Sequence, residues 1–213
     1  MIEYTKITVP FERDNDGTKK LMEGVYINDT IEMLKDISWE WTEKIDGTNI
    51  SVEWDGHSVS FHGRTERAEI PKHLLNKLEE MFLGDVNEEM FEQLFGEERV
   101  ILYGEGYGNK IQKCGAEYIN DGVSFILFDV YKPDKDLWVN RDAVIDIGKS
   151  FGIDVVPVLF RGTISEAVEF VKSRPNSTIG TAKMEGVVGR PYVELKDNQG
   201  KRIMVKVKAK DLL

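Results

Sequence analysis

The sequence predicts an α+β fold, with mixed, largely antiparallel sheets and helices on the outside. Three observations lead to this fold class. Apolar and polar residues alternate through residues 37–61, as they do in half-buried strands. Two uninterrupted apolar runs, at 100–103 and 124–131, have strand length and indicate strands covered on both faces. Residues 71–95 show the apolar spacing of a helix.

The elements can be justified in chain order. Asp55-Gly56 is a hairpin turn that joins an alternating strand to a returning one. Pro71 suits the first turn of the helix over 71–95. The remaining elements are expected as strands at 39–43, 49–54, 58–61, 186–188 and 202–208, and as helices at 140–151 and 164–173. Because no composition boundary divides the chain, we expect a single domain over residues 1–213.

The composition is that of a globular domain without a membrane segment. Of 213 residues, 41% are hydrophobic and 31% are charged. No apolar run approaches the roughly 20 residues of a membrane span, and no signal-peptide pattern opens the chain. Cys114 is the only cysteine, which excludes an internal disulfide and fits a reducing compartment. We therefore predict a cytoplasmic protein.

The charge is acidic overall and uneven along the chain. A net charge of -10 argues against a general nucleic-acid binder. Acidic residues gather within 79–98, and basic residues gather within 196–210. A local basic surface can still hold phosphate, although both runs could equally be solvated faces.

The segment Glu43–Asn49 carries the main chemical signal, a lysine two residues before Asp46-Gly47. An amine attacks a phosphate only when it is neutral, and nearby cations, a bound metal ion or desolvation favour that form. Glycine allows a tight turn that would fix where Lys44 points. The alternative is an exposed lysine beside a hairpin turn.

Five separate positions add to this signal. Arg64 has planar donors suited to phosphate, and Glu105, set between glycines, could hold a ribose hydroxyl or a metal-bound water. Phe128 could stack on a purine, or could simply be core. Glu185 at a strand start is a reasonable ligand for hydrated Mg²⁺. Asp129, inside an apolar run, needs partners.

Lys206 and Lys208 are two residues apart on a predicted strand and therefore share a face. Two like charges repel unless an anion lies between or above them, or unless the face is open to solvent. A nucleotide phosphate would satisfy this requirement.

This ordered set resembles the covalent nucleotidyltransferase superfamily of polynucleotide ligases and mRNA capping enzymes. The segment Glu43–Asn49 looks most like the ATP-dependent RNA ligases of the phage RNA ligase 2 type. The resemblance covers about residues 39–210 and implies an adenylyltransferase core. It implies that Lys44 attacks ATP to form a lysyl-AMP, that AMP passes to a 5′-phosphate, and that a 3′-hydroxyl then seals the strand.

The resemblance also assigns catalytic and metal roles. Lys206 and Lys208 would hold the α-phosphate and offset charge in the transition state. Glu185 would organise Mg²⁺ or Mn²⁺, together with Glu105, directly or through water.

The resemblance further assigns the nucleotide contacts. Glu43 and the backbone near Ile45 would read adenine, and Phe128 would stack on it. Arg64, with Glu105, would bind the ribose and phosphate surroundings, and Asn49 would support binding of the strand end.

The implied partners are ATP and RNA ends or a nicked RNA duplex, with no membrane, for a monomer acting in RNA repair. If the protein is phage-encoded, it would act in the host cytoplasm. We expect neither a C-terminal OB-fold domain nor a helical domain after residue 208. The alternatives are a minimal DNA ligase, a nucleotidyltransferase with another acceptor, and a non-catalytic nucleotide-binding domain of the same fold.

Overall fold

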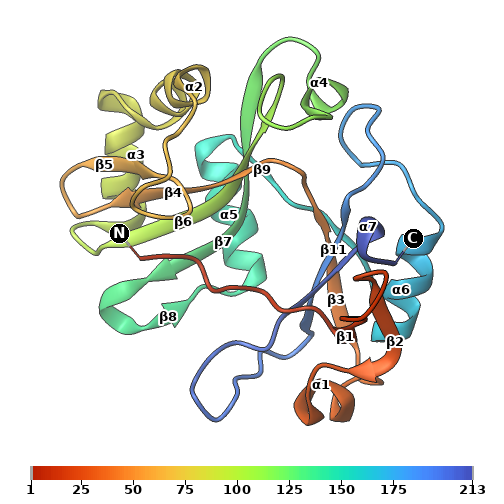
Figure 1. Cartoon of the computed structure of the whole chain (residues 1–213). Helices are drawn as coiled ribbons and strands as arrows, with labels where there is room; N and C mark the ends of the chain where they lie inside the picture. The colour runs from red at the N-terminus through yellow and green to blue at the C-terminus, as the bar shows by residue number, and fades with distance from the viewer. Residues whose placement is uncertain (1, 213) are drawn as a thin grey trace. The chain divides into compact units, whose positions relative to one another are not determined.

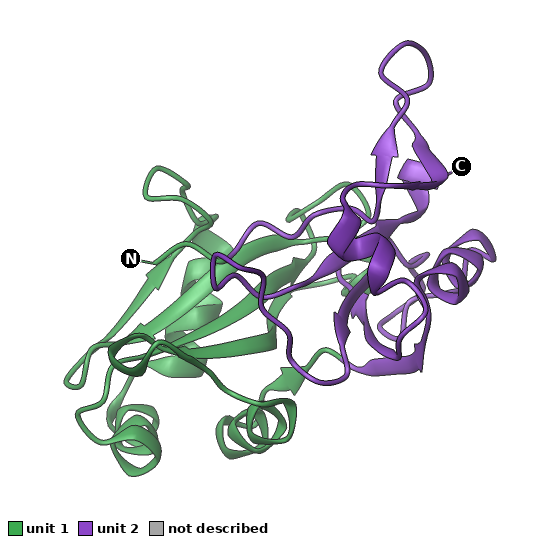
Figure 2. Ribbon diagram, turned by 90° about the horizontal axis from the view of Figure 1, so that it is seen from below, with its two compact units in different colours: residues 1–4, 46–156 green, residues 5–45, 157–213 purple. Residues whose placement is uncertain are grey.

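The computed structural model describes residues 2–212 and divides the chain into two compact units (Figure 2). Unit 1 comprises Met1–Tyr4 and Asp46–Val156, and unit 2 comprises Thr5–Ile45 and Pro157–Leu213. The prediction of a single domain is not tested by this division and stays a prediction. Within residues 2–212, no helix is long and apolar enough to cross a membrane.

Unit 1 is built on a six-stranded sheet with strand order β5-β4-β6-β7-β8, and β9 pairs in parallel with β7 (Figure 1). Its strands are β4 (Thr48–Trp54), β5 (Val59–His62), β6 (Val100–Gly108), β7 (Val123–Lys132), β8 (Leu137–Trp138) and β9 (Asp154–Val155). Its helices are α2 (Lys72–Phe82), α3 (Asp85–Phe95), α4 (Gly115–Tyr118) and α5 (Arg141–Phe151), with a 3-10 turn, η1, at Pro133–Lys135. One apolar core joins α2, α3 and α5 to the sheet.

A bulge in β7 changes which residues face this core. Tyr103 pairs with Asp129 and Gly104 pairs with Leu127, so Phe128 is an extra residue in β7. Leu127 and Val130 consequently both belong to the core. The bulge therefore changes the direction in which the side chains of Phe128 and Asp129 point, relative to a regular strand.

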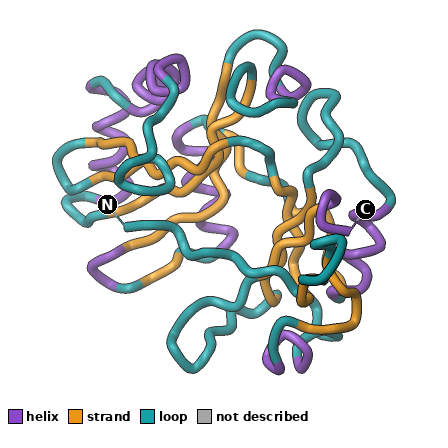
Figure 3. The backbone as a smooth tube through the Cα atoms, viewed as in Figure 1, coloured by secondary structure: helices purple, strands orange, loops and turns teal. Residues whose placement is uncertain are grey.

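Unit 2 contains a four-stranded sheet with strand order β10-β3-β11-β12. Its strands are β3 (Trp39–Lys44), β10 (Val158–Gly162), β11 (Gly186–Pro191) and β12 (Val205–Lys208). A β1–β2 pair (Phe11–Arg13 and Leu21–Tyr26) and three helices, α1 (Asp29–Met33), α6 (Ile164–Lys172) and α7 (Ala209–Leu212), complete the unit (Figure 3). Trp41, Val187 and Val207 are fully buried on one face of the sheet, against α6.

The α+β class and its largely antiparallel sheets are confirmed. Two of the boundaries that differ from the prediction have a plain physical cause. The helix over 71–95 is interrupted at Gly84, whose φ of +91° lies in the left-handed region that ends helices. The last strand begins at Val205 rather than at 202, because Arg202 forms only an isolated bridge, with Lys196.

Candidate active site

Lys44 and Lys208 belong to one row across three neighbouring strands of unit 2. Gly186 of β11 pairs with Lys44 of β3 on one side and with Lys208 of β12 on the other. Residues that pair directly in antiparallel strands point to the same face. Lys206, paired with Val188, lies one row along on the same face, while Val205 and Val207 are buried on the other. The predicted shared face of the two lysines is thus observed.

Gly186 is required by this row. A Cβ atom there would lie 2.1 Å from the Val207 carbonyl oxygen, a backbone atom that cannot move aside independently. The glycine therefore lets β12 approach β11 closely and leaves no side chain between Lys44 and Lys208.

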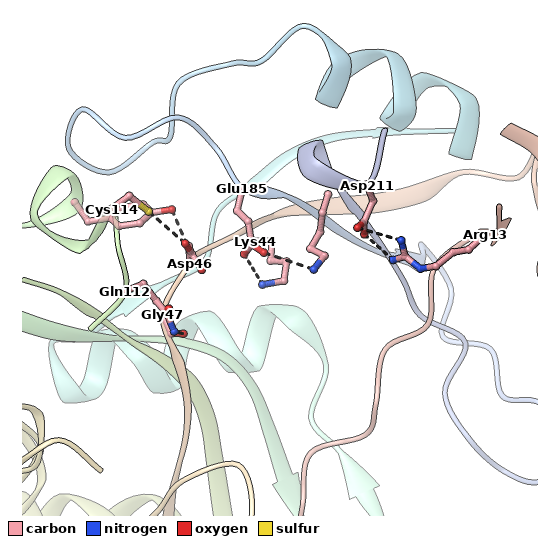
Figure 4. Close-up of polar contacts among 10 residues, drawn as sticks. Arg13, Lys44, Asp46, Gly47, Gln112, Cys114, Glu185 and Asp211 are labelled. Carbon is pink, nitrogen blue, oxygen red and sulfur yellow. Dashed lines mark hydrogen bonds and ion pairs between the residues drawn. The ribbon is translucent and has the colours of Figure 1, made fainter. Parts of the chain in front are cut away.

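Glu185 is the carboxylate that the two cations share (Figure 4). Lys44 Nζ donates to Glu185 Oε2 at 2.5 Å, and Lys208 Nζ lies 4.0 Å from Glu185 Oε1. Burial lowers the pKa of Lys208, and the opposing charges of Asp211 and Glu185 only partly offset that effect. The row therefore presents two partly buried cations around one anion.

A second ion pair supports the Lys208 end of the row (Figure 4). Arg13 of β1 donates to both carboxylate oxygens of Asp211, at 3.2 and 3.0 Å. Burial alone would raise the pKa of Asp211, but the hydrogen bond from Arg13 and the charge of Lys208 outweigh it and hold that pKa below its ordinary value. Neither Arg13 nor Asp211 was predicted from the sequence.

Glu43, next to Lys44, points to the opposite face of β3 and is buried. Its carboxylate accepts hydrogen bonds from the Ser177 hydroxyl and from the backbone N–H of Thr178, the latter at 2.9 Å. Ile45 is also buried and is the last residue of the first of the two chain segments that form unit 2. The Glu43 side chain therefore anchors the segment before Glu185, and its predicted contact with adenine stays a prediction.

The Asp46-Gly47 turn lies in unit 1 and is held by the loop around α4 (Figure 4). The Asp46 backbone N–H donates to the Tyr118 hydroxyl at 3.2 Å, Cys114 Sγ donates to Asp46 Oδ2 at 3.2 Å, and Gln112 donates to the Gly47 carbonyl at 2.9 Å. A Cβ atom on Gly47 would lie 2.3 Å from the carbonyl oxygen of Gly106. The tight approach predicted for this glycine is confirmed.

Asn49 and Glu105 also lie in unit 1, directly opposite each other on β4 and β6. Glu105 belongs to a strand rather than to the turn that its flanking glycines suggest. A Cβ atom at Gly104 would lie 2.3 Å from the Phe125 ring, and one at Gly106 would lie 2.5 Å from a Leu74 methyl group. These glycines therefore make room for the core beneath the strand.

Phe128 and Arg64 are the other two predicted residues of unit 1. Phe128 is half-buried and packs edge-on against Tyr4, with ring centroids 5.0 Å apart. Tyr4 also donates a hydrogen bond to the buried Asp129, at 2.8 Å, which is the kind of partner that this carboxylate was expected to need. Arg64 lies exposed in the loop between β5 and α2.

Unit 2 alone thus gathers Lys44, Lys208 and Glu185, with Lys206 one row away. The paired cations fit a polyphosphate, because ammonium groups and anionic oxygens attract and the site is only partly open to water. A single carboxylate also fits Mg²⁺, which takes one or two protein carboxylates together with substrate phosphates. Within residues 2–212, no three histidine, cysteine, aspartate or glutamate side chains form a metal-binding group on their own.

Comparison with known families decides the classification. The family model described as RNA ligase matches residues 37–208, which include every predicted site residue. The chain belongs to the RNA ligase family. The predicted family is confirmed, while the phage RNA ligase 2 type stays a prediction. No curated protein matches the sequence of this RNA ligase family member.

Solved structures of the RNA ligase from Naegleria gruberi share its fold. A lysine variant of that enzyme with ATP and Mn matches at a TM-score of 0.62 and 21% identity, covering 97% of this chain and 63% of the other. The same enzyme with PPi matches at a TM-score of 0.62 and 21% identity, covering 96% and 61%. A further lysine variant, with AMP and Mn, matches at a TM-score of 0.62 and 21% identity, covering 95% and 60%. This RNA ligase family member therefore spans about three fifths of the length of the structures it matches.

Proposed function

We propose that this protein is an ATP-dependent RNA ligase that seals 5′-phosphate and 3′-hydroxyl ends through a lysyl-AMP on Lys44. The observation that carries the proposal is the row of Lys44, Gly186 and Lys208, with Glu185 shared by the two cations. Such a row places a nucleophilic amine beside a cation suited to hold the phosphate that it attacks.

In the first step, Lys44 Nζ forms a bond to the α-phosphorus of ATP. The bond from that phosphorus to the bridging oxygen of the β-phosphate breaks, and pyrophosphate leaves with the electron pair. Lys44 must first lose a proton to solvent, because the ammonium group that pairs with Glu185 has no free electron pair.

Binding of the nucleotide would therefore exchange one contact for another. Phosphate oxygens would form ion pairs with the ammonium groups of Lys206 and Lys208, and Lys44 would separate from Glu185. Mg²⁺ or Mn²⁺, held by Glu185 and phosphate oxygens, would neutralise charge on the leaving pyrophosphate. The ATP, AMP, PPi and Mn named for the Naegleria gruberi structures support this choice of substrate and metal.

In the second step, a 5′-phosphate oxygen attacks the phosphorus of the lysyl-AMP, and the bond to Lys44 breaks. In the third step, a 3′-hydroxyl attacks the activated 5′-phosphate and AMP leaves. In unit 2, we assign adenine recognition to Glu43 and the backbone near Ile45. In unit 1, we assign stacking on a base to Phe128, and recognition of ribose, phosphate or strand end to Asn49, Arg64 and Glu105. A role in RNA repair and a cytoplasmic location, within a host if the gene is of phage origin, complete the proposal.

The test is incubation with α-labelled ATP and Mg²⁺. We expect an acid-labile label on the wild type and on Lys149→Ala, an exposed control lysine on α5, and none on Lys44→Ala. A wild type that takes up no label, even after pyrophosphate removes any bound AMP, contradicts the proposal. Uptake from GTP alone would indicate capping chemistry, and sealing of nicked DNA but not nicked RNA would indicate a DNA ligase.

A further inference from the structure

The unit 2 sheet carries a second charged cluster on the same face as Lys44, further along β3. Glu40 pairs in register with Arg161 of β10 and with Arg190 of β11, so the three side chains share this face. Arg161 donates to Glu40 Oε2 at 3.2 Å, and Arg190 lies 3.6 Å from Glu40 Oε1. Glu40 is buried between two arginines, one of which is 52% exposed as a side chain.

An exposed aromatic ring adjoins this cluster. Tyr192 is 58% exposed, and within residues 2–212 it is the only aromatic side chain among the exposed large apolar residues. The Arg161 guanidinium lies over its ring, 4.0 Å from the ring centroid. Because the interaction orders the ring without burying it, Tyr192 keeps surface on which a flat group can stack.

The charge of this face differs from that of the whole chain. The face and its edge carry five cations and two carboxylates, while the whole chain has a net charge of -10. The cations are Lys44, Arg161, Arg190, Lys206 and Lys208, and the carboxylates of the face and its edge are Glu40 and Glu185. In an acidic protein, such a local excess attracts a polyanion and orients it.

The two ends of this face are separated by a span that suits a nucleic acid. Lys44 and Glu40 are four residues apart on β3, or about 13 Å at the rise of a strand. At ~3.4 Å for each stacked nucleotide, about four nucleotides cover this length.

We propose that the cluster of Glu40, Arg161, Arg190 and Tyr192 is a docking surface for single-stranded RNA leading to the end that is sealed. Tyr192 stacks on a base and Arg161 binds the adjacent backbone, the combination by which proteins hold single strands. Glu40 keeps the two guanidinium groups in place. The inference rests on the proposed function, whose first step needs no RNA.

The test separates RNA binding from reaction with ATP. The probe is a 12-nucleotide single-stranded RNA with a 5′-hydroxyl and a 3′-fluorophore, which cannot be adenylylated, and binding is followed by anisotropy. We expect Tyr192→Ala to weaken binding about 5- to 150-fold, the range spanned by loss of one stacked base, and Tyr192→Phe to bind within about twofold of the wild type. Arg161→Gln should reduce the slope of log affinity against log salt by about 0.7.

Lys172→Gln is the matched control, because it removes one cation of unit 2 that pairs with Glu23 and Glu169 away from this face. It should leave both affinity and slope unchanged. Uptake of label from ATP should be the same in every variant, which also shows that each is folded.

Normal RNA affinity in Tyr192→Ala with normal label uptake overturns the inference and leaves the proposed function standing. So does equal weakening in Tyr192→Ala and Tyr192→Phe, since the hydroxyl rather than the ring would then be responsible. A wild type that binds the RNA but takes up no label contradicts the proposed function instead.

Discussion

The pair of Arg13 and Asp211 is expected to contribute stability that depends on pH. Two hydrogen bonds join an ionised carboxylate, nearly buried, to a guanidinium group that is 38% exposed. Hydrogen bonds to charged groups are worth about 1.5–3 kcal/mol, and partial exposure of Arg13 places this pair near the lower limit. Asp211→Asn should therefore lower the free energy of unfolding by about 1.5 kcal/mol at pH 7.

The sign of the pH dependence follows from the lowered pKa of Asp211. A carboxyl group whose pKa is lower when folded stabilises the protein above its ordinary value of 3.8, and that contribution is lost as pH falls through the folded value. Urea unfolding of wild type and Asp211→Asn should show the full difference at pH 7 and a shrinking one only below about pH 4.

Asp146→Asn is the control, because Asp146 forms an exposed pair with Lys149 on α5 and should cost less than about 0.5 kcal/mol. Equal stability of wild type and Asp211→Asn at pH 7 would refute the reasoning. A difference that is unchanged at pH 2 would refute it as well.

Three further predictions concern the row, the turn and the core. Gly186→Ala should destabilise unit 2 by about 1–3 kcal/mol, the usual range for overpacking, because the added Cβ atom meets the Val207 carbonyl oxygen. The same substitution should reduce uptake of label from ATP. Native stability together with native uptake would contradict this prediction. Burial, aided by the hydrogen bond to Asp46, raises the pKa of Cys114 from 9.0 to about 11, so its alkylation by iodoacetamide, followed by mass spectrometry, should still be accelerating well above its ordinary pKa; a rate that levels off at the same pH as in the urea-unfolded chain would contradict it. Val207→Ala should lower the free energy of unfolding in urea by about 2–3 kcal/mol, because Val207 is fully buried. Val193→Ala, at an exposed position, should change it by less than about 0.5 kcal/mol. Equal effects of the two substitutions would show that the β12 face is not packed as described.

Sequence reasoning succeeded where the signal is local. The two-residue period of a strand fixed the shared face of Lys206 and Lys208, and the Asp55-Gly56 turn fixed the pairing of β4 with β5. The break at Gly84 was missed because the apolar spacing continues across it, although a glycine in that position is the available signal.

Contacts between distant residues could not be predicted in the same way. Arg13 and Asp211 are 198 residues apart, and Glu43 and Thr178 are 135 apart. No period or turn links such positions, so a single sequence shows only that a buried carboxylate needs partners, not which ones. Tyr4, the partner of Asp129, lies near the chain start, where no motif marks it.

Glu185 explains how Lys44 and Lys208 can lie close together on one face of the sheet. The repulsion argument predicted an anion for Lys206 and Lys208, whereas the carboxylate of Glu185, just before Gly186, lies against Lys44 and Lys208. The dipeptide therefore has two separable roles, since the glycine keeps the space between Lys44 and Lys208 clear and the glutamate balances their charge. Under the proposed function, a phosphate that enters this space would compete with Glu185 for the same cations, so the carboxylate that balances the row would also set how strongly the row binds ATP.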